Sequence, residues 1–100
     1  MPKITTEIPH NLEKEEAATR LRDELDKRRA ELEQHVSDLQ ANWSGEELAY
    51  SFSTFGFKVD GTLLVEQDHV KVDANVPLPA LMFKGRIQQT IQDEFGKLLS

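Results

Sequence analysis

Apolar and polar residues alternate along much of the chain, and this alternation predicts five β-strands. In the first segment, residues 3–8, Ile4, Thr6 and Ile8 lie on one side and charged or hydroxyl side chains on the other, until Pro9 ends the segment. The same period of two recurs in residues 38–43, 47–54, 57–66 and 70–76. Strands with one apolar and one polar face are typical of an antiparallel sheet covered on one side.

Two other segments have the spacing of amphipathic helices. From about Glu13 to His35 the chain is highly charged and free of glycine, and its apolar residues recur at helical intervals. Arg28 and Arg29 interrupt this apolar stripe, so we expect the middle of the helix to be its least buried part. A final helix is predicted to begin near Pro79, with an apolar stripe of Ala80, Phe83, Ile87, Ile91, Phe95 and Leu98.

The end of the first helix has two interpretations. A helix reaching Trp43 would be about 46 Å long at 1.5 Å per residue. However, Leu39, Ala41 and Trp43 alternate with polar residues, and Ser44-Gly45 then marks a turn. We therefore predict a hairpin of residues 38–43 and 47–54, with the helix ending before Leu39.

These elements follow the order β-α-β-β-β-β-α. The five strands form an antiparallel sheet in this prediction, and the two helices cover its apolar face. The fold class is α+β with two layers, and the length of 100 residues predicts a single domain over residues 1–100.

Composition excludes several function classes. The chain has 12 basic and 18 acidic residues, and a net charge of −6 argues against binding to nucleic acid or an anionic membrane. It contains no cysteine, which excludes disulfides, thiolate catalysis and cysteine-ligated metal. The chain lacks the apolar core of a secretory signal and any apolar run long enough to span a membrane. We therefore expect a cytoplasmic protein.

The sequence also resembles a known family through scattered positions along nearly its whole length. These positions are Ile8-Pro9-His10, Leu12, Glu15-Glu16-Ala17, Trp43, Phe52, Gly61, Val65, Val70-Lys71-Val72 and Val76-Pro77. They are similar to the polyhydroxyalkanoic acid system family, short bacterial proteins often encoded near genes for polyhydroxyalkanoate synthesis and granules. Relatives tend to carry a small residue at the position of Glu13, so the cap of the first helix departs from the family pattern.

The resemblance implies a small version of the helix-grip (Bet v 1/START-like) architecture, but no catalytic residues, because no activity is established for the family. It favours a non-enzymatic accessory protein that associates with the polyhydroxyalkanoate granule, its coat proteins or a synthase. The alternative is a helix-grip protein that binds a small apolar ligand of hydroxyacyl or lipid type. The rings that would line its cavity, or else fill the core, are Trp43, Tyr50, Phe52, Phe57, Phe83 and Phe95.

No pattern of polar residues predicts catalysis, and we expect neither a metal nor a cofactor. The sequence has no nucleophile-elbow, phosphate-loop or dinucleotide motif. His10, His35 and His69 do not have the spacing of a metal site. His10 remains a candidate functional residue, beside a structural interpretation in which its ring bonds the loop before the first helix.

A candidate partner contact lies at the start of the last helix. At 100° per residue, Met82 falls opposite the buried stripe, with Leu78 near the same side and Leu81 at the edge of the stripe. A methionine beside leucines forms an adaptable apolar patch. If the protein docks on a granule coat protein, a synthase or a second copy of the chain, we expect Leu78, Leu81 and Met82 to make the contact; the alternative is that they are single exposed apolar residues, which are common on protein surfaces.

Overall fold

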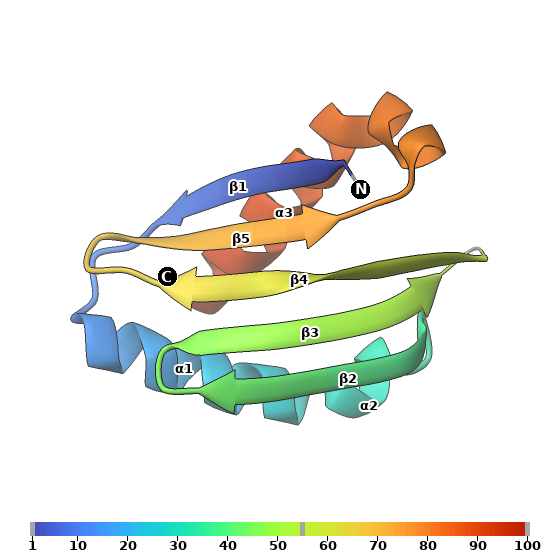
Figure 1. The fold of residues 1–100 in the computed structure, drawn as a ribbon. Coiled ribbons are helices and arrows are strands. Elements are labelled where there is room, and N and C mark those ends of the chain that lie inside the picture. The colour runs from blue at the N-terminus through green and yellow to red at the C-terminus, as the bar shows by residue number, and fades with distance from the viewer. Residues whose placement is uncertain (1, 55, 100) are drawn as a thin grey trace.

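The computed structural model describes residues 2–54 and 56–99. Its five strands form one antiparallel sheet in the order β1-β5-β4-β3-β2 (Figure 1). Along the chain the elements are β1 (Lys3–Pro9), α1 (Lys14–Lys27), α2 (Arg29–Leu32), β2 (Ser37–Ser44), β3 (Glu47–Thr54), β4 (Phe57–Val65), β5 (His69–Asn75), the 3₁₀ helix η1 (Leu78–Phe83) and α3 (Lys84–Leu99).

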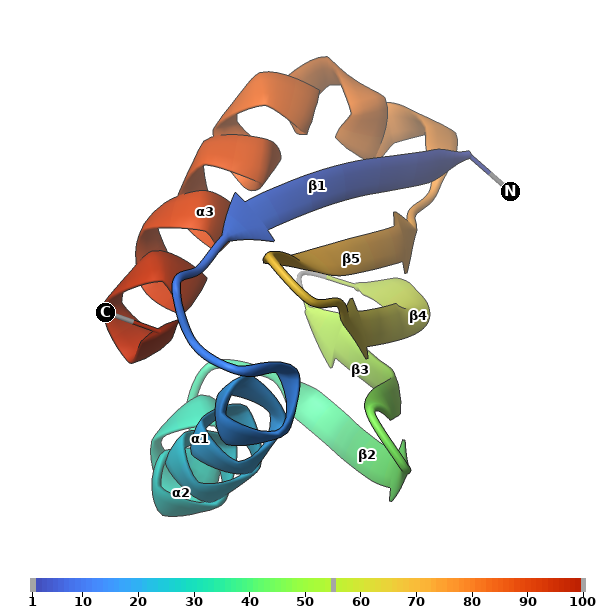
Figure 2. The ribbon, with the colours of Figure 1, turned by 90° about the vertical axis from the view of Figure 1, so that its left-hand side faces the viewer.

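All helices lie on the same side of the sheet (Figure 2). On that side the α3 helix runs along the edge strand β1, while α1 and α2 lie toward the opposite edge, near β2. Among the described elements, none covers the remaining face of the sheet in either view, so that face is open. The predicted fold class, α+β in two layers with a five-stranded antiparallel sheet, is confirmed.

The predicted hairpin after the first helix is also confirmed. Ser44 pairs with Glu47, and the two residues between them make the turn. Gly45 has a φ of +63°, which suits the first position of a tight hairpin turn and is costly for a residue with a Cβ. The residues with strand-like alternation therefore form β2 and do not continue the helix of the charged segment before them.

The first helix is shorter than predicted. It ends at Lys27 instead of continuing to about His35, and Arg28 interrupts it with φ −96° and ψ 2°. The following turn, α2, contains no buried residue. Tertiary packing supplies most of the stability of a helix, and without an apolar anchor after Arg28 the chain can turn back toward β2.

The last helix also begins differently from the prediction. The α-helix starts at Lys84, and the segment before it, Leu78–Phe83, forms the 3₁₀ helix η1. Pro79 still lies in the first turn of this segment. The prediction that Phe83 belongs to the buried stripe is wrong, because its side chain, the last of η1, is 51% exposed.

The core consists of two clusters between the sheet and the helices. The larger cluster joins Leu21 of α1 and Leu99 of α3 to Leu63, Val65 and other residues of the central strands. The smaller one lies at the opposite end of β1 and joins Ile4, Ala74 and Val76, against which Ala80, Leu81 and Ile87 pack. The helices are therefore anchored firmly where α1 meets the end of α3 and more lightly where η1 begins.

Candidate functional site

The large apolar side chains that remain exposed are concentrated in η1. The exposed fraction is 70% for Leu78, 85% for Met82 and 51% for Phe83. Leu81 lies between them in sequence but packs against the smaller core cluster. Leu81 thus fastens η1 to the sheet, while Leu78, Met82 and Phe83 face solvent. Of the three residues predicted as a partner contact, the structure exposes Leu78 and Met82 and uses Leu81 as an anchor.

Two further exposed apolar residues belong to elements at the same end of the molecule. Phe57 at the start of β4 is 39% exposed, and Leu32 in α2 is 38% exposed. Figure 1 shows that η1, the start of β4 and α2 all lie toward the end of the sheet where β5 finishes. These five exposed residues, spread across that end of the sheet from η1 beside β1 to α2 beside β2, are called here the apolar end: Leu32, Phe57, Leu78, Met82 and Phe83.

Sequence reasoning found only part of this region. The alternation in residues 57–66 places Phe57 on the apolar face of the sheet. Phe57 begins β4, whereas the residues of β4 that the helices bury lie at its other end. Of the rings predicted to line a cavity or fill the core, Phe57 and Phe83 do not fill the core, because both side chains are exposed. Their exposure could have been predicted from their positions, because Phe57 begins β4 and Phe83 ends η1.

The other predicted aromatic residues lie at the border of the core. Trp43, Tyr50 and Phe95 are partly buried and pack against the larger cluster. The Arg22 guanidinium lies over the Trp43 ring, 5.1 Å from its centroid, in a cation–π contact. Phe52 stacks on Tyr50, with ring centroids 6.3 Å apart. Trp43 of β2 and Tyr50 of β3 thus extend the larger cluster toward the β2 edge of the sheet.

Tyr50 reaches across a neighbouring strand. Its register partner on β4 is Gly61, and the Tyr50 hydroxyl passes over that glycine to donate to the backbone carbonyl of Asp73 on β5, at 2.7 Å. A Cβ at Gly61 would overlap the Asp73 carbonyl. Burial, together with the charges of Asp73 and Asp60, raises the pKa of Tyr50 to about 12. The phenol is therefore a neutral structural donor at physiological pH.

His10 joins the loop before α1 to the turn between β4 and β5. Its Nδ1 accepts a hydrogen bond from the backbone N–H of Leu12 at 3.1 Å, and its Nε2 lies 3.0 Å from the Glu66 carbonyl oxygen. The neutral ring that fits both partners carries its proton on Nε2. The backbone N–H of His10 also donates to the Asp68 carbonyl at 3.0 Å. The buried His10 thus holds the start of α1 in place.

His69 follows the same turn, as the first residue of β5, and is half-buried. The Asp68 carboxylate lies 2.7 Å from its Nδ1, and Glu7 lies 4.0 Å from its Nε2. The hydrogen bond with Asp68 raises the pKa of His69 and lowers that of Asp68. His35 is exposed near the start of β2. Across residues 2–54 and 56–99, the side chains form no group of three or more histidines and carboxylates that could hold a metal ion.

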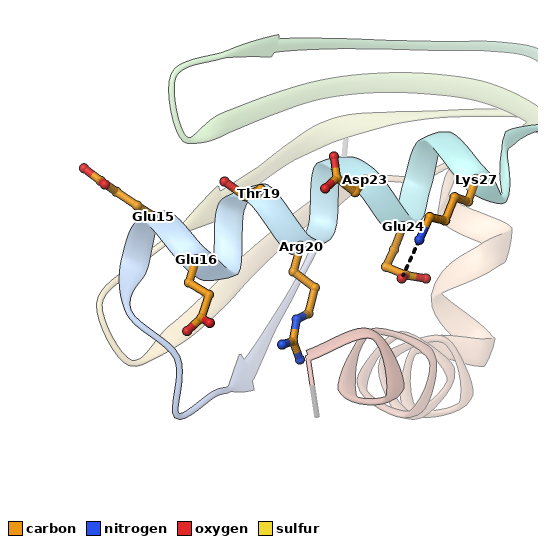
Figure 3. Close-up of a pocket in the computed structure, with 7 residues that line it drawn as sticks. All are labelled: Glu15, Glu16, Thr19, Arg20, Asp23, Glu24 and Lys27. Carbon is orange, nitrogen blue, oxygen red and sulfur yellow. Dashed lines mark ion pairs between the residues drawn. The ribbon is translucent and has the colours of Figure 1, made fainter.

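One surface groove of the described residues crosses the outer face of α1 (Figure 3). Side chains of both charges line it, with Arg20 directed toward α3 and Lys27 paired with Glu24 at 3.8 Å. Pairs of this kind along an exposed helix face are weak contributors to helix stability. The groove therefore has the character of a solvated helix face.

The second groove lies between β1 and α3. Gln88 and Gln92 donate their side-chain amides to the backbone carbonyls of Thr5 and Glu7, at 2.9 and 3.4 Å. Thr6 also lines it, and its hydroxyl, within a residue that is 3% exposed, has no hydrogen-bond partner among the described atoms. Neither groove contains any of the aromatic residues predicted to line a ligand cavity.

None of the described helices has the length and apolar character needed to cross a membrane. Neither the curated proteins nor the solved structures gave a match to the chain. The family model of the polyhydroxyalkanoic acid system proteins (PHA_gran_rgn) does match, and the match extends over residues 4–99. The chain therefore belongs to the polyhydroxyalkanoic acid system protein family.

Proposed function

We propose that this protein is a non-enzymatic accessory protein of polyhydroxyalkanoate metabolism that associates with the granule through the apolar end. Membership of the family supplies the metabolic context. The exposed residues Leu78, Met82 and Phe83 carry the proposal, because they place three large apolar side chains outside the core on one short segment.

The composition of η1 suits contact with an apolar surface. A granule presents an aliphatic polyester and the proteins that coat it, so its surface offers apolar groups to a docking protein. Burial of exposed apolar area is the main driving force for such association. Met82 adds a flexible, polarisable side chain that adapts to irregular surfaces. The residues of η1, Leu78–Phe83, carry no charge, so docking would not require the desolvation of a charged group on this segment.

The structural roles of the polar side chains support a function without catalysis. His10 bonds to two backbone groups, and Tyr50 bonds to a third, so both contribute to the fold. His69 is paired with carboxylates at a solvated turn. In this proposal the protein is cytoplasmic, acts by contact at the granule surface, and needs no cofactor.

Fractionation of polymer-accumulating cells tests the proposal. The double variant L78K/M82K places two charges on the apolar end, at side chains that contribute little to the core. The matched control T19K/T90K adds the same charge at exposed helical positions. We expect the wild-type protein and the control to be recovered with granules and L78K/M82K to remain in the supernatant. Equal recovery of all three proteins would reject the apolar end as the docking site.

A second candidate function is the binding of a small apolar ligand. The observation that favours it is the stacked pair of Tyr50 and Phe52, which is only partly buried on the helix-facing side of β3. Trp43, the single tryptophan, lies on the adjacent strand and would report an apolar ligand through its fluorescence. A saturable change with a hydroxyacyl ester that Phe52→Ala abolishes would favour this function, and no change would exclude it for that ligand.

A further inference from the structure

The two edge strands of the sheet, β1 and β2, differ in how far they are protected from pairing with another chain. At β1, the outward carbonyls of Thr5 and Glu7 accept hydrogen bonds from Gln88 and Gln92 of α3. This strand also carries charged residues near both ends. Natural sheets prevent an edge strand from pairing with another chain by covering the strand or by placing charges along it. The β1 edge is therefore blocked.

At β2, the opposite edge, alternate residues direct their backbone groups outward. Ser44 and Glu47 close the tight turn as a hydrogen-bonded pair, so Asn42, two residues earlier, also bonds to β3. The N–H and C=O groups of Ala41 and Trp43 consequently point away from the sheet. Within the described residues, no partner satisfies these outward groups.

The side chains of this edge do not oppose pairing. Residues 39–44 include neither a charge nor a proline, although 30% of the whole chain is charged. Arg29 of α2 donates to the Leu39 carbonyl at 3.1 Å, and this contact closes the edge at one end only. Asp38, with a φ of +54°, lies at a register shift between β2 and β3 and limits the regular part of the strand to the residues that follow.

We propose that β2 pairs antiparallel with β2 of a second copy of this chain, around a twofold axis at Asn42. In this register Ala41 of each copy lies opposite Trp43 of the other, and each such pair exchanges both of its backbone hydrogen bonds. The contact between Arg29 and Leu39 remains undisturbed. The two sheets join into one continuous sheet, and the open edge disappears.

The identity of the occupant follows from self-complementarity. A twofold interface brings the same patch of both copies together, so a charged patch on this chain of net charge −6 would repel itself. Residues 39–44 of β2, which make the contact, carry no charge. At the axis, Asn42 meets Asn42, and a carboxamide both donates and accepts, so it can bond with an identical group. A strand from an unrelated protein would not require either property.

This inference is independent of the proposed granule association. The residues of the apolar end belong to η1, β4 and α2, whereas the pairing residues belong to β2. Substitutions at one surface leave the other intact. Loss of granule recovery and loss of self-association are therefore separate results.

Sedimentation of the purified chain over micromolar to millimolar concentrations tests the pairing. The wild-type protein should reach twice the chain mass of 11.4 kDa. Asn42→Lys places like charges opposite each other at the axis and should weaken dimerisation at least about tenfold. Ala49→Lys is the matched control, because Ala49 is the exposed register neighbour of Asn42 on β3, away from the edge. It should dimerise like the wild type, and circular dichroism checks the fold of both.

A single-cysteine variant gives a positive test, because the natural chain contains no cysteine. In the proposed register, the two Cα atoms at position 42 form a non-hydrogen-bonded pair about 4.5 Å apart, within the range of a disulfide. Asn42→Cys should form a disulfide-linked dimer on mild oxidation, at least about tenfold faster than Ala49→Cys. A monomeric wild type at millimolar concentration would overturn the proposal. So would equal crosslinking of the two cysteine variants, or a dimer lost in L78K/M82K and kept in Asn42→Lys.

Discussion

The Tyr50 hydroxyl donates to the backbone carbonyl of Asp73 at 2.7 Å, across the strand that separates them. This bond links three neighbouring strands through one side chain. It requires a glycine on the middle strand, because a Cβ at Gly61 would overlap the Asp73 carbonyl and lie 2.8 Å from the hydroxyl. The position of Gly61 in the family resemblance thus has a physical reason in this chain.

Substitution of Gly61 should therefore destabilise the protein. We expect Gly61→Ala to lower the free energy of unfolding by about 1–3 kcal/mol, because the backbone of β5 must move to admit the methyl group. Gly85→Ala is the control, since a Cβ there meets nothing within 4 Å, and alanine should raise helix stability by up to about 1 kcal/mol. Urea unfolding measures both. An unchanged free energy of unfolding in Gly61→Ala would contradict the close approach of the three strands.

The phenol of Tyr50 should ionise at a higher pH than an ordinary tyrosine. Tyr50 is the single tyrosine of the chain, so absorbance of the phenolate reports it directly, and we expect half-ionisation near pH 12. Since its folded pKa is raised above the ordinary value of 10.0, the stability from the neutral phenol is complete below pH 10 and is lost as pH rises through 12. For this partly exposed side chain the loss is on the order of 2 kcal/mol. Tyr50→Phe should remove this dependence, and a midpoint near 10 would show that the phenol is solvated.

Thr6 provides a stabilising substitution. Its hydroxyl is buried and unpaired within the described residues, so replacement by the isosteric valine removes a polar group without changing the packing. We expect Thr6→Val to raise the free energy of unfolding by about 1 kcal/mol. The adjacent Thr5 donates to Asp73 at 2.7 Å on the open face, and Thr5→Val should be neutral or slightly destabilising. Chemical denaturation of the pair checks the difference, and a loss of stability in Thr6→Val would reveal a hidden partner.

His10 should affect stability and leave docking unchanged. His10→Ala leaves the Leu12 N–H and the Glu66 carbonyl without their partner, and we expect a loss of about 1–3 kcal/mol. At temperatures where the variant remains folded, its recovery with granules should equal that of the wild type. Complete loss of recovery by folded His10→Ala would instead make His10 a functional residue.

The sequence predicted the strands well because their alternation is a local property. Leu39, Ala41 and Trp43 distinguished a strand from a helical continuation, and each strand was placed to within a residue or two. The break at Arg28 was anticipated only as a weakly buried stretch, because the end of a helix depends on whether later residues find a core. Whether later residues find a core is decided by tertiary packing, which the local sequence does not show.

The candidate site was less predictable for the same reason. The predicted α-helical phase placed Met82 on the exposed side, as observed, but placed Phe83 on the buried side, because the apolar pattern does not distinguish a 3₁₀ helix from the first turns of an α-helix. The bonds of His10 to Glu66 and of Tyr50 to Asp73 join residues far apart in sequence. Such contacts appear only once the register of the sheet is known.

The most direct test of the granule proposal is the binding of purified protein to isolated polyhydroxyalkanoate granules, measured by cosedimentation. We predict saturable binding of the wild type and of T19K/T90K, and binding of L78K/M82K that is at least about tenfold weaker, because each lysine would have to be desolvated at the apolar contact. Binding that is absent in the wild type, or equal in L78K/M82K and the wild type, would contradict the account.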